Sequence, residues 1–210
     1  GLRAMQPQGP YRLAGYSFGG VVALEMAFQL TRDGDAVEFV GLFDTHNPAA
    51  PVRYYSMRER LRVFWSQNAA VPVWRRLWLV QARLREGIET HHRAKAELRA
   101  AQGIGPAESY SDLRRVQVRQ HNWRAMQAYR PQPYQGRITL FKAAAVSDKL
   151  ERPTDYGWAG LAGGGLDVVL IAGEHLTLFA SENIESLARA LTDSLRQPDG
   201  VDLPPTAVPV

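Results

Sequence analysis

The feature that most constrains the fold is a serine set among glycines between two patterned segments. The sequence GYSFGG, residues 15–20, follows a short apolar run at residues 11–15 and precedes a stretch with helical spacing at residues 21–30. A second apolar run, residues 37–43, comes next and ends at Asp44. This succession of strand, turn, helix and strand is a βαβ unit, and it predicts a parallel sheet.

The turn itself has the form G-x-S-x-G. Between a strand and a helix, this pattern predicts a nucleophile elbow, a strained turn that lifts the hydroxyl of Ser17 above the sheet. We expect Gly15 and Gly19 to allow strand and helix to approach, and Gly20 to add clearance. The backbone N–H of Phe18 would then be one donor of an oxyanion hole at the helix N-terminus. The other interpretation is a glycine-rich turn that binds nothing.

A serine hydroxyl needs an adjacent base and an acid that orients the base. Asp44, at the carboxyl end of the next strand, is one candidate acid. Asp148, a few residues beyond the apolar run at residues 137–141, is the competing candidate. The residues themselves leave both open.

The base is predicted from its place in the chain. His175 follows the apolar run at residues 166–171 and precedes a final amphipathic helix, which gives the order Ser, Asp, His of α/β hydrolases. His46 is interpreted as a loop residue. His91 and His92 lie in a charged helical run, where exposure to solvent is expected. For His121, in the basic insertion, two interpretations stay open: it lines a cleft or it faces water.

The middle of the chain has a different character. Residues 52–130 hold 16 lysines and arginines against 6 aspartates and glutamates, whereas the rest holds 9 against 15. The pattern there is of amphipathic helices without a convincing strand. We therefore predict a core formed by residues 1–52 and 131–197, a basic helical insertion over residues 53–130, and a Pro-rich tail over residues 198–210.

Composition excludes several classes of function. The chain has no cysteine, so disulfides, thiolate metal sites and a cysteine nucleophile are ruled out. We expect no metal site, no cofactor of its own and no membrane span, because no apolar run approaches the required length. The basic region carries no nucleic-acid recognition motif, so nucleic-acid binding is not expected. The cytoplasm is the expected compartment.

Four segments resemble the thioesterase domains of polyketide synthases and nonribosomal peptide synthetases, members of the α/β-hydrolase superfamily. They are QPQGPYRLAGYSFGG at residues 6–20, LFDTHNP at 42–48, YQGRITLF at 134–141, and GEHLTLF at 173–179, where the family usually has G-D-H. The resemblance implies an α/β-hydrolase fold with a parallel sheet core and a helical lid at residues 53–130. It favours Asp44 over Asp148 as the acid.

One departure from the family lies at the start of the chain. The family has several strands before the nucleophile strand, with a loop that supplies the second oxyanion donor, but this chain begins only 16 residues before Ser17. We therefore expect that these N-terminal strands are missing and that the chain is a fragment of a longer protein.

The resemblance also implies a reaction. Ser17 would attack an acyl thioester on the phosphopantetheine arm of an acyl or peptidyl carrier protein, with His175 as base and Asp44 as its orienting acid. Hydrolysis and cyclisation both stay open. The alternatives are a discrete editing thioesterase, a general esterase or lipase, and a non-enzymatic acyl-binding module.

The insertion bears on partner and substrate. A strongly basic lid would steer an acidic carrier protein toward the site. Its aromatic residues would line an acyl channel, although such residues are also typical of a lid's own core. The channel candidates are Trp65, Trp74, Trp78, Trp123, Tyr54 and Tyr55.

Overall fold

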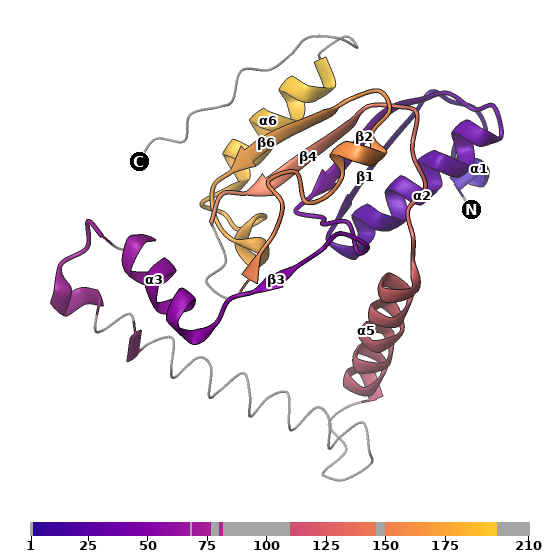
Figure 1. The fold of residues 1–210 in the computed structure, drawn as a ribbon. Coiled ribbons are helices and arrows are strands. Elements are labelled where there is room, and N and C mark those ends of the chain that lie inside the picture. Colours follow the sequence, from indigo (N-terminus) through magenta and orange to yellow (C-terminus); the bar gives the residue numbers. More distant parts are fainter. Residues whose placement is uncertain (1, 68, 77–79, 82–109, 146–149, 197–210) are drawn as a thin grey trace. The chain divides into compact units, whose positions relative to one another are not determined.

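A computed structural model describes residues 2–67, 69–76, 80–81, 110–145 and 150–196 (Figure 1). The chain divides into two compact units, one formed by residues 1–54 and 129–210 and the other by residues 55–128. Each end of the second unit lies two residues inside the insertion predicted from the sequence. The predicted Pro-rich tail lies outside the described residues.

A four-stranded sheet forms the centre of the first unit (Figure 1). Its strand order is β1-β2-β4-β6, and every neighbouring pair is parallel. The α/β class with a parallel sheet core is thereby confirmed. All four strands fall where the apolar runs predicted them: β1 (Tyr11–Tyr16), β2 (Val37–Phe43), β4 (Ile138–Ala143) and β6 (Leu166–Ile171).

Helices α2 (Phe18–Arg32) and α6 (Ile184–Arg196) cover opposite faces of this sheet. Side chains alternate between the two faces along each strand. Leu42 therefore packs in the cluster that contains Leu24 of α2, whereas its neighbour Phe43 packs in the cluster that contains Leu187 of α6. Two separate apolar cores thus hold the strands whose ends carry the candidate site.

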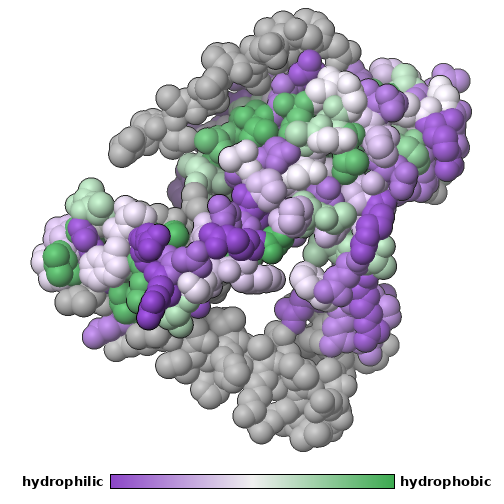
Figure 2. Space-filling view, in the orientation of Figure 1, coloured by the Kyte–Doolittle hydropathy of each residue, from purple (hydrophilic) through white to green (hydrophobic). Residues whose placement is uncertain are grey.

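Several short elements complete the first unit. They are α1 (Leu2–Met5), the antiparallel pair β3 (Arg53–Tyr54) and β5 (Leu150–Glu151), and the 3-10 turns η1 (Ala159–Leu161) and η2 (His175–Thr177). Hydrophobic residues also gather near β6 in the space-filling view (Figure 2). On β6 itself, Val168 and Leu170 are 39% and 41% exposed.

The second unit contains α3 (Met57–Gln67) and α5 (Tyr110–Ala128). Phe64 is buried and meets Trp65 edge to face at 5.7 Å, and the guanidinium of Arg76 lies 5.4 Å from the Trp65 ring. Leu61 and Met57 lie about one and two turns from Trp65 along α3, yet they are 51% and 66% exposed. The amphipathic pattern predicted for this region is therefore present in α3, but of its large apolar side chains only that of Phe64 is buried.

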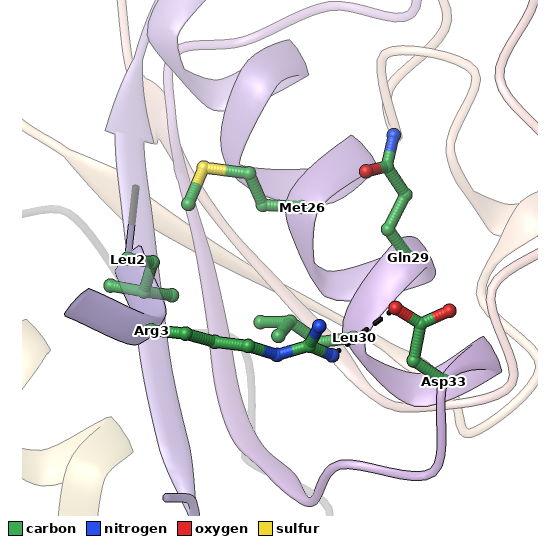
Figure 3. Close-up of a pocket in the computed structure, with 6 residues that line it drawn as sticks. All are labelled: Leu2, Arg3, Met26, Gln29, Leu30 and Asp33. Atoms are coloured by element: carbon green, nitrogen blue, oxygen red, sulfur yellow. Dashed lines mark hydrogen bonds and ion pairs between the residues drawn. The ribbon is translucent and has the colours of Figure 1, made fainter. Parts of the chain in front are cut away.

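A pocket of about 270 Å³ lies between α1 and the second half of α2 (Figure 3). Arg3 bridges its rim through ion pairs with Asp33 at 3.1 Å and Asp35 at 2.5 Å. Because Ser17 immediately precedes the first residue of α2, this pocket lies toward the other end of that helix and is separate from the elbow. No helix among the described residues is long and apolar enough to cross a membrane.

Candidate active site

Ser17 occupies the turn between β1 and α2 in a strained conformation, with φ 54° and ψ −121°. A positive φ is costly for a residue with a side chain and persists only where its surroundings fix it. Here the Ser17 N–H donates to the carbonyl of Phe43 at 2.9 Å, and the Ser17 carbonyl accepts from Gly20 N–H at 3.1 Å. The turn is thus fastened to the end of the neighbouring strand, as an elbow requires.

The three glycines of the elbow differ from the prediction in which of them must lack a side chain. A Cβ on Gly15 would overlap the backbone of Gly19, so the expectation for Gly15 is confirmed. A Cβ on Gly19 would meet nothing within 4 Å, so the expectation for Gly19 is wrong. The tight position is Gly20, where a Cβ would overlap the side chain of Thr45. The reason is helical geometry, because consecutive residues of α2 point about 100° apart, and of these two glycines only Gly20 faces the Thr45 side chain.

Thr45 stabilises the serine turn through hydrogen bonds to backbone carbonyls, and no role was predicted for it from the sequence. It is 1% exposed, and its Oγ1 lies 3.0 Å from the Ser17 carbonyl, to which it donates, and 3.1 Å from the Phe43 carbonyl. The Thr45 carbonyl accepts from Nε1 of Trp158 at 2.7 Å. A small polar residue directly after Asp44 was a usable signal for Thr45, whereas the sequence around Trp158 offered none.

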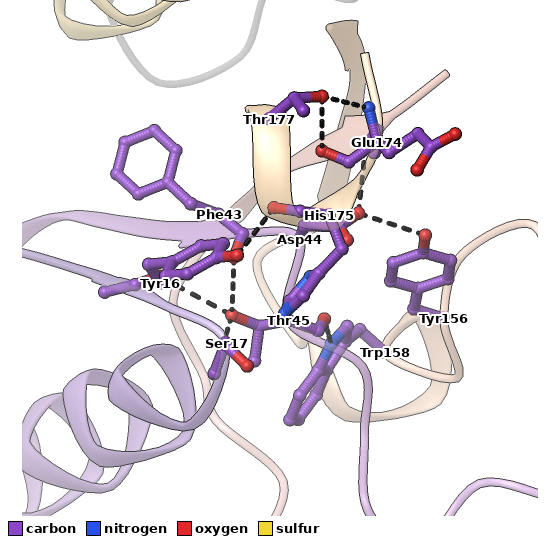
Figure 4. A network of polar contacts seen from close by, with 12 residues as sticks. Tyr16, Ser17, Phe43, Asp44, Thr45, Tyr156, Trp158, Glu174, His175 and Thr177 are labelled. Atoms are coloured by element: carbon purple, nitrogen blue, oxygen red, sulfur yellow. Dashed lines mark hydrogen bonds and ion pairs between the residues drawn. The ribbon is translucent and has the colours of Figure 1, made fainter. Parts of the chain in front are cut away.

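Asp44 follows β2 and is 4% exposed. Its Oδ2 lies 2.7 Å from Nδ1 of His175, and its Oδ1 accepts from the N–H of Ala143 at 2.9 Å and the hydroxyl of Tyr156 at 3.0 Å (Figure 4). Burial is the strongest influence and raises the pKa of Asp44. The hydrogen bonds from His175, Ala143 and Tyr156 together outweigh it, so the pKa lies below its ordinary value. The carboxylate is therefore ionised and fixed in orientation at neutral pH.

Tyr156 is a second residue that the sequence did not reveal. Burial, followed by the charge of Asp44, raises its pKa, so the hydroxyl stays protonated and donates to the carboxylate. The alternative acid Asp148 lies outside the described residues. The carboxylate that contacts His175 is that of Asp44.

His175 begins η2, directly after β6. Because ionised Asp44 can only accept, Nδ1 of His175 carries the proton of their hydrogen bond and leaves Nε2 as the basic nitrogen. The preceding turn uses Gly173 at φ 97°, where a side chain would strike Asn183. Glu174 caps η2 through its backbone and Thr177, so its part is structural.

Among the described histidines, the one hydrogen-bonded to Asp44 is His175. His46 is half-buried, and burial, followed by the charges of Arg152 and His175, lowers its pKa to about 4. His121 is exposed on α5, with Nδ1 2.7 Å from the carbonyl of Gln117. His91 and His92 lie outside the described residues.

The remaining predicted site residues are spread over the chain. Phe18 is the first residue of α2, so its N–H has no acceptor within the helix and suits the oxyanion role. The channel candidates Trp65, Trp74, Trp123 and Tyr54 are 39%, 72%, 56% and 75% exposed, and Tyr55 is half-buried. Trp78 lies outside the described residues, so the channel stays a prediction. Within the described ranges, no cluster of His, Asp and Glu suits a metal ion.

Curated relatives match the chain over short segments. The chain is 55% identical over 47 residues to the vanchrobactin synthetase VabF of Vibrio anguillarum, and 45% identical over 67 residues to the bikaverin polyketide synthase bik1 of Gibberella fujikuroi. These segments are 22% and 30% of this chain but only 2% and 3% of the two relatives. A third relative, 57% identical over 44 residues, is named an inactive atromentin synthetase, invA6 of Paxillus involutus.

Solved structures match over nearly the whole chain. The NocB thioesterase domain in covalent complex with a fluorophosphonate nocardicin G analogue is 30% identical with a TM-score of 0.60, over 93% of this chain and 70% of that one. The four-domain nonribosomal peptide synthetase AB3403 is 27% identical with a TM-score of 0.62, over 94% of this chain and 15% of that one. The family model of the thioesterase domain matches residues 1–195. The chain therefore belongs to the thioesterase domain family of polyketide synthases and nonribosomal peptide synthetases.

Proposed function

We propose that the chain releases an acyl, polyketide or peptidyl chain from a carrier protein through an acyl-enzyme on Ser17. The observation that carries this proposal is the 2.7 Å contact between buried Asp44 and Nδ1 of His175, because it prepares Nε2 as a base next to the strained serine turn. The residues come from the carboxyl ends of β1, β2 and β6, the edge of a parallel sheet where α/β active sites are built.

The chemistry follows from these positions. Oγ of Ser17 attacks the thioester carbonyl while Nε2 of His175 takes its proton, and the Phe18 N–H stabilises the developing oxyanion. The C–S bond breaks, and the phosphopantetheine thiol leaves with the proton returned by His175. Water or a nucleophile within the acyl chain then attacks the ester with His175 again as base, giving a free acid or a cyclic product. Asp44 holds the imidazole in one tautomer throughout.

The partner would be an acyl or peptidyl carrier protein that presents its phosphopantetheine arm. The relatives support this, since their names are those of synthases and synthetases that assemble chains. The basic insertion supports it as well, because exposed arginines on α3 and α5 would attract an acidic carrier: Arg58, Arg62, Arg114 and Arg124. We propose that residues 55–128 act as the lid of this site.

Labelling with a fluorophosphonate tests the acyl-enzyme. The full-length wild-type protein is expected to be labelled at Ser17, and Ser17→Ala is expected to abolish labelling. Ser194→Ala is the matched control, because Ser194 Oγ donates to the Ala190 carbonyl on α6 at 2.8 Å and should not react. Labelling that persists in Ser17→Ala would refute the serine mechanism.

The second candidate is a non-catalytic acyl-binding module. The observation that favours it is the 57% identity over 44 residues between this chain and a relative whose name describes it as an inactive synthetase. Release assays separate the candidates. A thioesterase frees the chain from a loaded carrier, an editing enzyme prefers short acyl groups, an esterase cleaves oxygen esters without a carrier, and a binding module releases nothing.

A further inference from the structure

Tyr16 joins the serine turn to the histidine loop in two ways. It is the last residue of β1 and directly precedes Ser17. Its hydroxyl donates to the backbone carbonyl of His175 at 2.5 Å (Figure 4). Its ring stacks on the imidazole of the same residue, with centroids 4.8 Å apart and an interplanar angle of 25°. One side chain thus contacts both the main chain and the ring of a residue 159 positions away.

His175 needs such support because little else holds its ring. Its side chain is 42% exposed and it begins a 3-10 turn of three residues. The hydrogen bond to Asp44 fixes the Nδ1 edge, but rotation about that contact would still swing Nε2 away from the serine turn. A flat ring packed against one face of the imidazole restricts this rotation.

Tyr16 is itself held in place by aromatic neighbours. Phe179 meets the Tyr16 ring edge to face at 5.2 Å and also meets Phe43 at 5.5 Å. Through Phe43, the last residue of β2, these contacts link the phenol to the residue that directly precedes Asp44. The plane of the Tyr16 ring is therefore set by the same framework that sets the carboxylate.

We propose that Tyr16 is a positioning residue that sets the plane of the His175 imidazole so that Nε2 faces Oγ of Ser17. The electron-rich face of the phenol also stabilises the imidazolium that forms when the serine is acylated. This inference rests on the proposed serine mechanism, which assigns His175 the proton transfer. It adds a residue whose effect is on the orientation of the base.

The chain offers a matched control on the same strand. Tyr11, at the other end of β1, also donates its hydroxyl to a backbone carbonyl, that of Gln6 at 3.1 Å. It is 1% exposed, and it packs in the α2-side core. Tyr11→Phe therefore removes an equivalent hydrogen bond away from His175.

The test measures fluorophosphonate labelling of Ser17 in the full-length protein and separates the maximal rate of inactivation from the inhibitor constant. Tyr16→Phe, which keeps the ring, is expected to lower the maximal rate roughly fivefold, the scale of one lost hydrogen bond. Tyr16→Leu is expected to lower it by about 100-fold, the scale of a misplaced catalytic group. The inhibitor constant should stay unchanged, and Tyr11→Phe should label like wild type.

A proton NMR signal provides a second readout that does not depend on Ser17. The downfield resonance of the His175 Nδ1 proton should persist in Tyr16→Phe and broaden in Tyr16→Leu. Wild-type rates in both Tyr16 variants, or an unchanged resonance in Tyr16→Leu, would overturn the proposal. If Tyr16→Leu does not fold, Tyr16→Phe decides by its rate. Loss of the resonance in Tyr16→Leu without any labelling of wild type would refute the serine mechanism but leave the positioning role intact.

Discussion

The two units of the molecule differ in what they bury. The sheet unit encloses large side chains completely, with Leu42, Phe141 and Trp158 each 0% exposed. In the described part of the second unit, the buried large hydrophobic residue is Phe64, while Met57 and Trp74 are 66% and 72% exposed. Residues 52–130, which include this unit, also carry the excess of lysine and arginine, 16 against 6 acidic residues.

Under the proposed function, this difference separates two tasks. Proton transfer tolerates little error in geometry, and the candidate site lies where backbone and side chains are held from several sides. Recognition of varied acyl chains and of a carrier protein suits exposed charge and exposed aromatic rings. The comparison therefore predicts large effects from small changes in the sheet unit and small, partner-dependent effects from changes in the second unit.

The largest effect is expected from Asp44→Asn. The amide keeps the shape but can no longer hold the required tautomer of His175, so labelling and turnover should fall by roughly 10⁴-fold. Asp167→Asn is the control. Asp167 lies on β6 and forms an ion pair with Arg137 at 2.8 Å, so its substitution should affect stability without changing the rate. Rate assays on both folded variants check this. A mild loss in Asp44→Asn would show that Asp44 is not the acid of the site.

The next effect concerns packing beneath the serine turn. Gly20→Ala should lower the free energy of unfolding by about 1–3 kcal/mol, because the new methyl group overlaps the Thr45 side chain. Gly19→Ala, one residue away, should change it by less than about 1 kcal/mol, since nothing lies within 4 Å. Urea titration measures both. Equal losses would contradict the division of roles between these glycines.

A smaller effect is expected from pH. Folding lowers the pKa of His46 from 6.5 to about 4, mainly through burial. Above pH 6.5 the imidazole of His46 is neutral in both the folded and the unfolded chain. Between pH 6.5 and about 4, this imidazole binds a proton in the unfolded chain but not in the folded chain. The free energy of unfolding should therefore fall by about 2 kcal/mol as the pH drops through this range, a value reduced for the solvent contact of the ring.

His46→Gln should remove this part of the pH dependence in chemical unfolding. The control is His121→Gln, which replaces an exposed histidine of the second unit. Matching curves for wild type and His46→Gln would show that the ring of His46 does not titrate in this way.

The smallest effect is expected in the second unit. Reversing the charges of Arg58, Arg62, Arg114 and Arg124 to Glu should lower turnover of a carrier-bound thioester by about tenfold at low salt, because steering depends on ionic strength. A small-molecule thioester should be released at the wild-type rate. Arg189→Glu on α6, where the side chain is 78% exposed, is the control in the sheet unit. Equal losses on both substrates would argue against carrier docking.

The sequence predicted the sheet well because its strands are continuous apolar runs and its turn residues are specific. The residues alone left Asp44 and Asp148 open as the acid, and the resemblance to thioesterase domains favoured Asp44, whose carboxylate contacts His175. The sequence could not predict the support around them. Tyr156 reaches Asp44 from 112 positions away, and only the folded chain brings these residues together.

The role of Gly19 was mistaken for a related reason. The pattern G-x-S-x-G names both flanking glycines alike, but the rotation of α2 decides which glycine faces a neighbour. Thr45, whose side chain crowds Gly20, lies two residues beyond the end of β2. Local sequence patterns therefore locate the turn, while the identity of its tight contact depends on a residue from elsewhere in the chain.

The pairing of β2 with β4 has a consequence for how such proteins diversify. These strands are hydrogen-bonded neighbours, although residues 55–128 are inserted between them in the chain. The entropy lost on closing a loop grows only with the logarithm of its length, so doubling or halving the insertion changes that loss by only about 0.6 kcal/mol. An inserted segment can therefore be lengthened, shortened or exchanged at little cost to the register of the sheet. Under the proposed function, such an exchange would bring new substrates to an unchanged set of reacting groups.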